Sequence, residues 1–365
     1  MRVHLTGDYL AQQNIDLVAT LRAPQLIERT GPPTATIATA VARARRRLRD
    51  EIDELFRGTP QVAGVLRAML LGDRSFVDRT EAENFQKTGV FHVLVVAGLH
   101  VGAIAFALYW VGRKLRLSRL WTMLFTLSLL GAYVAVVEQR APVLRAALMA
   151  AIVVLGGFFF RRLELLNSAA IAALILLTAS PLALRDSSFQ LTFVAIGCIA
   201  AIALPWLAKT VQPYVRALRG WRDAGREPRA VQFRIDLRSV AQLLTSLSPN
   251  WIGNRAGDIV VGGLSFTLRV WELLVLTVAL QVGMLPLMAR DFHRIPLSAP
   301  LVNLAAVPLT GIVVPIGFLT LACALIFPAA GKLLAAPLSW LTGLLLHAVQ
   351  WFPRICGHVG FKGSM

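Results

Sequence analysis

The sequence is poor in charged residues and lacks the motifs of common soluble enzymes. Only 16% of its 365 residues are charged, whereas soluble domains carry about 25%. It has no GxxxxGK[ST] phosphate loop, HExxH, CxxC or His-x-His-x-Asp-His run. The three cysteines, Cys198, Cys323 and Cys356, share no metal-ligand spacing. We therefore expect no enzyme activity, no catalytic residue, no bound metal and no cofactor.

The first 30 residues also lack the apolar segment that a secretory signal peptide needs. They alternate weakly between apolar and polar residues and predict one or two strands. Two strands do not fold alone, so residues 1–30 are expected to be a remnant of a larger β domain or to rest on another part of the protein.

Apolar residues are abundant, at 56% of the chain with a mean hydropathy of +0.64. They form uninterrupted runs near or above the roughly 17–25 residues that cross a hydrocarbon core about 30 Å thick. Lipid offers no hydrogen-bond partners, so such runs must be helices, and barrel strands would alternate. The sequence predicts an all-α polytopic membrane protein with about seven to nine transmembrane helices.

The expected membrane domain covers residues 89–352, followed by a short tail at 353–365. We expect spans at about 90–111, 120–137, 141–160, 168–184, 191–208, 268–289 and 333–352. Five prolines in 283–317 predict Pro-broken, discontinuous helices over 297–328, and such backbone is tolerated in membranes only inside protein or beside a cavity. This region is the strongest sequence indication of a translocation path. Simple kinked helices are the alternative.

Two amphipathic stretches precede the membrane domain, within residues 37–88. In the first, Ile37, Val41, Ala44, Leu48, Ile52 and Leu55 share one helical face. The second carries Val62, Leu66, Met69 and Leu70. Neither stretch is long and apolar enough to span, so both are expected to be interfacial helices in the headgroup plane. Packing on a small soluble domain is the alternative.

The net charge is strongly positive, with 37 Lys and Arg against 20 Asp and Glu. Basic connections alternate with connections that carry little positive charge, and this predicts that the basic ones (112–119, 161–167 and 209–262) are cytoplasmic and that residues before about 89 are external. Trp110, Trp121 and Trp206 flank the cytoplasmic side as interface anchors. The excess charge fits the positive-inside bias and anionic lipid, or a polyanionic partner such as nucleic acid.

Polar residues at membrane depth are candidates for function, because each costs free energy unless it is paired or faces water. The candidates are Gly98, His100, Arg140, Arg145, Asp186, Gln190, Asn303 and Pro308. Several have structural alternatives: a helix–helix hydrogen bond for His100, a paired snorkelling group for Arg140 and a loop for Asp186. Arg145 lies deeper in its span than Arg140, so a structural reading of it is weaker.

Two further patterns concern the first span. In the span predicted at 90–111, His92 and His100 lie about 80° apart around the helix and therefore do not form a metal pair on one face. Gly98 and Gly102 form a small-xxx-small step that lets another helix approach closely.

Four ordered motifs resemble the competence domain of the ComEC DNA-uptake channel family. The first is FHVLVVAGLHVG at 91–102, preceded by LLGDRS at 70–75 and FQKTG at 85–89. The others are Arg140 and Ala141 followed by Met149, DSSFQLTF at 186–193, and the proline-rich stretch 296–317. The resemblance covers about residues 37–350. It implies import of one DNA strand across the bacterial inner membrane, an external DNA receptor, a cytoplasmic helicase-type motor and an OB-like domain of which residues 1–30 are the remnant.

The sequence departs from this family in three ways. Ala97 stands where the family usually has serine, the sequence begins in what resembles the last strands of the OB-like domain, and it ends at Met365, where many members continue into a metallo-β-lactamase-like domain. A shortened member or a fragment would explain the last two departures. The other functions considered are a permease for a small anionic or amphiphilic solute and an inactive membrane scaffold, and a homo-oligomer is possible for each.

Overall fold

The computed structural model describes residues 36–94, 98–137, 141–159, 165–219, 228–247, 253–292 and 298–355. Within these ranges the chain is helical and contains no strand, which confirms the all-α prediction for them. The predicted strands of 1–30, and the tail from residue 356 on, lie outside the described residues. The chain divides into two units, Met1–Arg43 and Ala44–Met365.

The described part of the first unit is the start of helix α2. The Thr36 amide donates to Thr39 Oγ1 at 3.1 Å, and the Thr39 amide donates to Thr36 Oγ1 at 3.4 Å. This reciprocal pair satisfies two backbone donors that a helix N-terminus otherwise leaves free.

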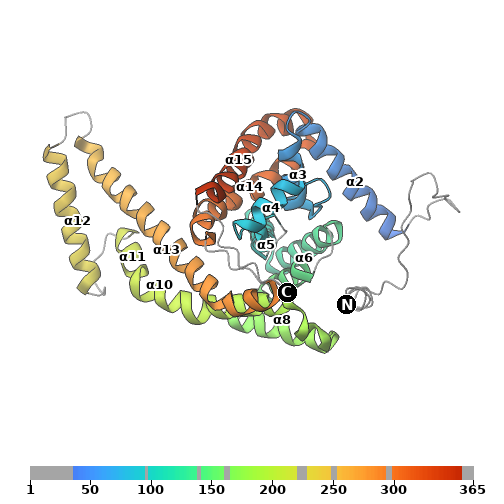
Figure 1. The fold of residues 1–365 in the computed structure, drawn as a ribbon, viewed down its shortest axis with the longest axis horizontal. Coiled ribbons are helices and arrows are strands. Elements are labelled where there is room, and N and C mark those ends of the chain that lie inside the picture. The colour runs from blue at the N-terminus through green and yellow to red at the C-terminus, as the bar shows by residue number, and fades with distance from the viewer. Residues whose placement is uncertain are drawn as a thin grey trace. The chain divides into compact units, whose positions relative to one another are not determined.

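The helices follow one another along the chain with short connections (Figure 1). They are α2 (Ile37–Leu55), α3 (Pro60–Leu71), α4 (Arg79–Lys87), η2 (Phe91–Val93), α5 (Gly98–Lys114), α6 (Arg119–Val136), α7 (Ala141–Phe158), α8 (Leu165–Ala179), η3 (Pro181–Arg185), α9 (Ser187–Cys198), η4 (Ile199–Ala203), α10 (Leu204–Thr210), α11 (Gln212–Arg219), α12 (Pro228–Leu247), α13 (Gly253–Phe292), α14 (Ala299–Ile326) and α15 (Pro328–Ile355).

Within the described part of the chain, six segments are long and apolar enough to cross a membrane. They are Arg119–Val136, Ala141–Phe158, Ser187–Thr210, Val261–Asp291, Ala299–Ile326 and Pro328–Trp351. By helix length and hydropathy this is a multi-pass membrane protein. The predicted span at 168–184 corresponds to the shorter apolar helix Leu166–Ala179, and the predicted span at 90–111 is the 3₁₀ turn η2 followed by the 17-residue α5.

The predicted breaks at prolines are wrong for α13 and α14. Pro286 lies inside α13, and Pro308 and Pro315 lie inside α14, which runs unbroken for 28 residues. A proline removes one intrahelical hydrogen bond, and in a membrane neighbouring helices and local adjustments of the backbone compensate for that loss.

Helices α14 and α15 form a hairpin that carries the main apolar core (Figure 1). Only Phe327 separates the two helices. At Gly331, a Cβ atom would meet Ala324 Cβ at 2.5 Å, so a glycine is needed where α15 turns back beside α14.

Helix α3 is enclosed by protein. Ten of its 12 residues are buried, including the charged Arg67. Leu70 lies against Gly317 in the second half of α14, where a Cβ would meet Leu70 Cδ1 at 3.0 Å. The amphipathic pattern of this stretch therefore describes only part of its environment, because residues off its apolar face are covered too: Gly64 lies against the backbone of Phe76, and Arg67 pairs with Asp53.

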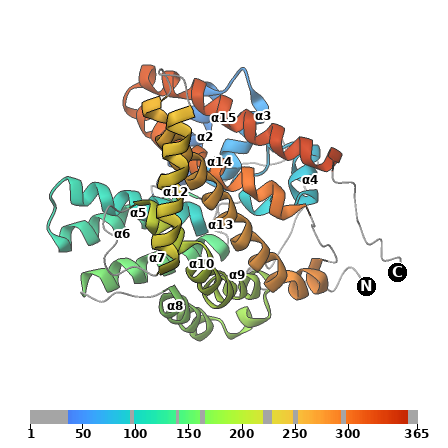
Figure 2. The ribbon, with the colours of Figure 1, turned by 90° about the vertical axis from the view of Figure 1, so that its left-hand side faces the viewer.

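The second-unit part of α2 has its apolar face on the same core, with Ile52 fully buried and Leu48 and Leu55 packed beside it. Helices α5, α6 and α7 all pack against one another (Figure 2). Helix α9 lies against α7 and α13, and α12 packs along α13.

Candidate functional site

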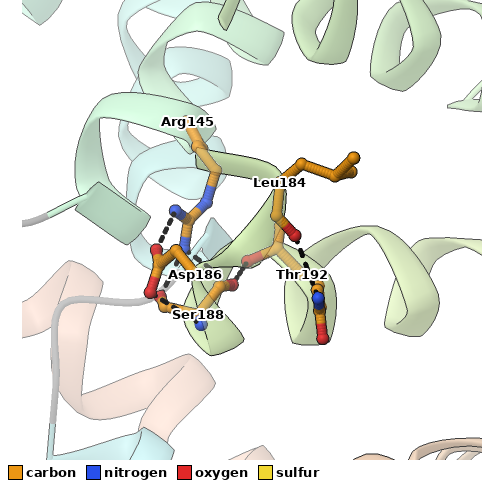
Figure 3. Close-up of polar contacts among 6 residues, drawn as sticks. Arg145, Leu184, Asp186, Ser188 and Thr192 are labelled. Carbon is orange, nitrogen blue, oxygen red and sulfur yellow. Dashed lines mark hydrogen bonds and ion pairs between the residues drawn. The ribbon is translucent and has the colours of Figure 1, made fainter. Parts of the chain in front are cut away.

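The most developed polar cluster lies between α7 and the start of α9 (Figure 3). Arg145 is four residues into α7, about 6 Å from the helix start at a rise of 1.5 Å per residue. Its side chain is only 4% exposed. One guanidinium nitrogen, Nη2, donates to Ser188 Oγ at 2.6 Å and to the Ser188 carbonyl at 2.9 Å. Ser188, at the start of α9, thus accepts two hydrogen bonds from this buried guanidinium.

Asp186 takes part more weakly. Its Oδ2 lies 3.8 Å from Arg145 Nη1, and the aspartate side chain is 44% exposed. Its Oδ1 also accepts from the Ser188 amide at 3.2 Å, which caps the N-terminus of α9. A helix N-terminus favours a negative charge, so the cap alone accounts for an aspartate at this position. The same residue then offers a second oxygen to Arg145.

Two further side chains fix the turn into α9 (Figure 3). Thr192 Oγ1 donates to the Ser188 carbonyl at 2.9 Å, the same oxygen that Arg145 binds. Gln190 Nε2 donates to the Leu184 carbonyl at 2.9 Å, which ties α9 to the 3₁₀ turn η3. These contacts hold Ser188 in place opposite Arg145.

One nitrogen of the Arg145 guanidinium makes no hydrogen bond to the residues that the structure describes. This nitrogen, Nε, is buried. Burying a guanidinium is costly unless its donors are satisfied. Among the described residues, Arg145 therefore combines two short hydrogen bonds to Ser188, one long ion pair to Asp186 and one unused donor.

The structure brings together three of the candidates predicted from the sequence: Arg145, Asp186 and Gln190. Arg140 lies outside the described residues. Asn303 and Pro308 are both in α14; Pro308 is exposed and Asn303 is half-buried. The Oδ1 atom of Asn303 is buried and, within the described ranges, accepts no hydrogen bond. Within those ranges, no hydrogen bond or ion pair links either residue to Arg145.

The two predictions about the first span require correction. His92 is in η2 and His100 is in α5, so the angle between them on one helix does not apply. The two imidazoles lie close enough to interact electrostatically, and His100 is buried. At Gly98 a Cβ would make ordinary contact with Ala146 Cβ at 3.7 Å, and at Gly102 it would meet nothing within 4 Å. The packing therefore does not require a small residue at either position.

A second set of charged contacts was not predicted from the sequence. Along one stripe of α2, at four-residue spacing, Arg45, Arg49 and Asp53 each bind a different partner. Arg45 Nη2 donates to the carbonyl of Val137 at 2.9 Å, at the C-terminal end of α6. Arg49 Nε lies 2.9 Å from Asp73 Oδ2. Asp53 Oδ2 lies 2.7 Å from Arg67 Nη2.

We refer to Arg45, Arg49 and Asp53 as the α2 stripe. It joins α2 to the end of α6, to the loop after α3 and to α3 itself. The guanidinium of Arg67 also lies 4.2 Å from the ring centre of Phe76. The LLGDRS motif at 70–75 is thus part of an ion-pair network. The only sequence signal was the i, i+4 spacing of these three charges, which lie off the apolar face of α2.

Two carboxyl groups outside the membrane-spanning segments have shifted pKa values. Burial raises the pKa of Asp73, but hydrogen bonds from Ser75 and the charges of Arg49 and Arg67 outweigh it, so this pKa lies below its ordinary value. Burial, followed by the nearby charge of Asp78, raises the pKa of Glu81. Glu81 Oε1 is buried without a hydrogen-bond partner among the described residues.

Across the described ranges, no group of three or more His, Cys, Asp or Glu side chains is arranged to hold a metal ion. The α7–α9 cluster holds a buried guanidinium against the hydroxyl and carbonyl of Ser188 and, at longer range, the carboxylate of Asp186. The fold and this cluster together define a helical, multi-pass membrane protein with an internal basic site.

Comparison with known proteins assigns the family. The family described as Competence protein matches residues 69–361, which is most of the chain. The chain therefore belongs to the Competence protein family. All four motifs that carry the resemblance to ComEC lie within or begin inside this matched segment.

One curated relative is ComE operon protein 3 of Bacillus subtilis (strain 168). It is 30% identical over 134 residues, which cover 37% of this chain and 17% of that protein. The aligned segment thus spans less than a fifth of the relative's length. No solved structure matches the chain.

Proposed function

We propose that this protein is a channel component that imports single-stranded DNA across the bacterial inner membrane during natural transformation. Membership of the Competence family and the multi-pass helical fold support this role. The observation that carries it is the buried Arg145, which has an unused Nε donor and a long contact to Asp186.

The chemistry of a DNA strand suits this site. Each nucleotide carries one phosphate charge, and arginine binds phosphate through parallel hydrogen bonds. A phosphate that reached Arg145 would compete with Asp186 at 3.8 Å more easily than with Ser188 at 2.6 Å. In this account Ser188 positions the guanidinium, and Asp186 neutralises it when no strand is present.

The proposal includes the orientation and partners that the sequence indicates. The basic connections face the cytoplasm and the segment before residue 89 faces outward, so a DNA receptor acts outside and a helicase-type motor acts inside. This chain has no nuclease activity of its own in this account, and strand degradation belongs to another protein or domain. Anionic lipid surrounds the basic connections.

The test is complementation of a transformation-deficient deletion strain. Expression of this chain should restore recovery of a chromosomal marker from added DNA, and should make a labelled strand resistant to external nuclease. A strain that expresses the chain in its membrane but gains neither property would contradict the proposed function. Uptake of small anionic solutes without DNA uptake would favour the permease alternative.

A further inference from the structure

The turn between α5 and α6 has an unusual residue at its tightest point. The Leu117 amide donates to the Gly112 carbonyl at 3.1 Å, and the Arg116 amide donates to the Arg113 carbonyl at 3.1 Å. This pair of bonds is the Schellman arrangement that ends many helices. Its central residue, Arg116, has a φ of 57°, and it is the one described non-glycine residue with positive φ.

Glycine is the residue that this position favours, because a Cβ is strained in the left-handed region. Strained backbone conformations of this kind cluster at residues whose side chains contribute to function. The Arg116 side chain is exposed, so it does not contribute to the protein core. The backbone of this turn therefore points to a role for the guanidinium at the surface.

The neighbouring residues combine positive charge with exposed apolar groups. Arg113 and Lys114 are exposed beside Arg116. Lys114 Nζ lies 5.3 Å from the ring centre of Trp110, which is itself half exposed. Leu115 and Trp121 are 63% and 62% exposed. Basic side chains interleaved with exposed Trp and Leu are typical of the membrane–water boundary.

A shallow groove begins at this turn and follows α6. It has a volume of about 310 Å³ and is lined by Leu117, Trp121, Leu124, Phe125 and Ser128. From Arg119, where α6 begins, to Ser128 the helix rises about 14 Å, close to the thickness of one leaflet of the hydrocarbon core, about 15 Å. Because α6 is a candidate span, the groove has the length and polarity of a site for one acyl chain.

We propose that the α5–α6 turn and this groove bind a phospholipid with an anionic headgroup. The headgroup phosphate contacts the guanidinium groups of Arg113 and Arg116, and one acyl chain lies in the groove along α6. A nucleic-acid strand fits less well, because it has no acyl chain to fill the apolar groove beside the basic residues. The site is separate from the α7–α9 cluster and does not depend on the proposed transport function.

The test compares retention of phosphatidylglycerol and phosphatidylcholine by the purified full chain, using native mass spectrometry after incubation with equal amounts of each lipid. The wild-type protein should retain phosphatidylglycerol several-fold more. Arg116→Gly should bring the ratio close to one while leaving the melting temperature unchanged or higher, because glycine relieves the backbone strain. Loss of stability is therefore no explanation for a lost preference.

Two further variants complete the design. Ser128→Phe fills the groove without changing charge and should lower retention of both lipids. Lys332→Gln removes an exposed lysine beside the exposed Leu333 of α15, outside the basic connections, and should leave the ratio at its wild-type value. An equal ratio in the wild-type protein would overturn the proposal, as would an unchanged ratio in Arg116→Gly. Arg116→Gly that weakens binding of a labelled DNA strand while keeping its lipid preference would assign the turn to nucleic acid instead.

Discussion

The hydroxyl of Ser188 accepts a hydrogen bond from Arg145 at 2.6 Å, across 43 residues of sequence. This contact joins α7 to the N-terminus of α9 and fixes a cation that is almost completely buried. Asp186 adds a charge without a short contact, so the guanidinium is oriented by a neutral partner and only partly neutralised. Under the proposed function, that combination leaves the guanidinium able to exchange its contact with Asp186 for one with a phosphate.

The α2 stripe should contribute to stability through Arg67. Asp53→Asn leaves the buried guanidinium of Arg67 without its carboxylate partner, and we expect a loss of about 1–3 kcal/mol, because Asp53 itself is half exposed. Thermal unfolding in detergent measures this, and adding Arg67→Met should recover much of it. As a control, Arg79→Met removes the exposed pair with Glu83 and should cost at most about 0.5 kcal/mol. Equal losses in Asp53→Asn and the control would contradict the role of the stripe.

Glu81 should make stability depend on pH. Because its pKa is raised in the folded protein, folding favours the protonated form. The stabilising contribution is complete below the ordinary pKa and is lost as pH rises through the folded value. Glu81→Gln should therefore be more stable than wild type at pH 7, and the difference should shrink toward pH 4. A difference that is constant with pH would show that ionisation of Glu81 is not involved.

Two glycines of α15 should respond in opposite directions to the same substitution. Gly331→Ala places a methyl 2.5 Å from Ala324 Cβ and should destabilise the α14–α15 hairpin, by about 1–3 kcal/mol. Gly343→Ala meets nothing within 4 Å and should be neutral or stabilising by up to about 1 kcal/mol, because alanine favours helix. Melting temperatures of the two variants decide this, and a stable Gly331→Ala protein would contradict the close approach.

The predicted orientation can be checked by labelling single cysteines. Ser75 and Ser239 are both exposed, in segments predicted to be external and cytoplasmic. In a background without the native cysteines, an impermeant reagent added to intact cells should modify Ser75→Cys and spare Ser239→Cys. The opposite pattern would reverse the proposed orientation.

Much of the helical arrangement could be predicted because long apolar runs have one solution in lipid. The predicted spans at 120–137 and 141–160 agree with α6 and α7 to within two residues. The burial of α3 could not be predicted in the same way. The apolar spacing of α3 is the same whether one face or all faces are covered, and the contacts of Gly64 with Phe76 and of Arg67 with Asp53 come from packing that the spacing does not specify.

The candidate site was predicted as separate residues. Polar groups at membrane depth identified Arg145, Asp186 and Gln190, but nothing local indicated that Ser188 would be the main partner of Arg145. A serine at the start of a helix is also explained by the turn that precedes it. Pairing across 43 residues depends on how α7 and α9 pack, which the sequence alone does not specify.

The most direct test of the transport account is transformation frequency in strains that carry Arg145 variants at equal membrane abundance. Arg145→Leu should reduce DNA import at least tenfold while the protein remains in the membrane, and Arg145→Lys should retain part of the activity, since it keeps the charge but not the paired donors. Arg290→Leu, which removes an exposed arginine at the end of α13, should import DNA normally. Normal import by Arg145→Leu at wild-type abundance would contradict the account.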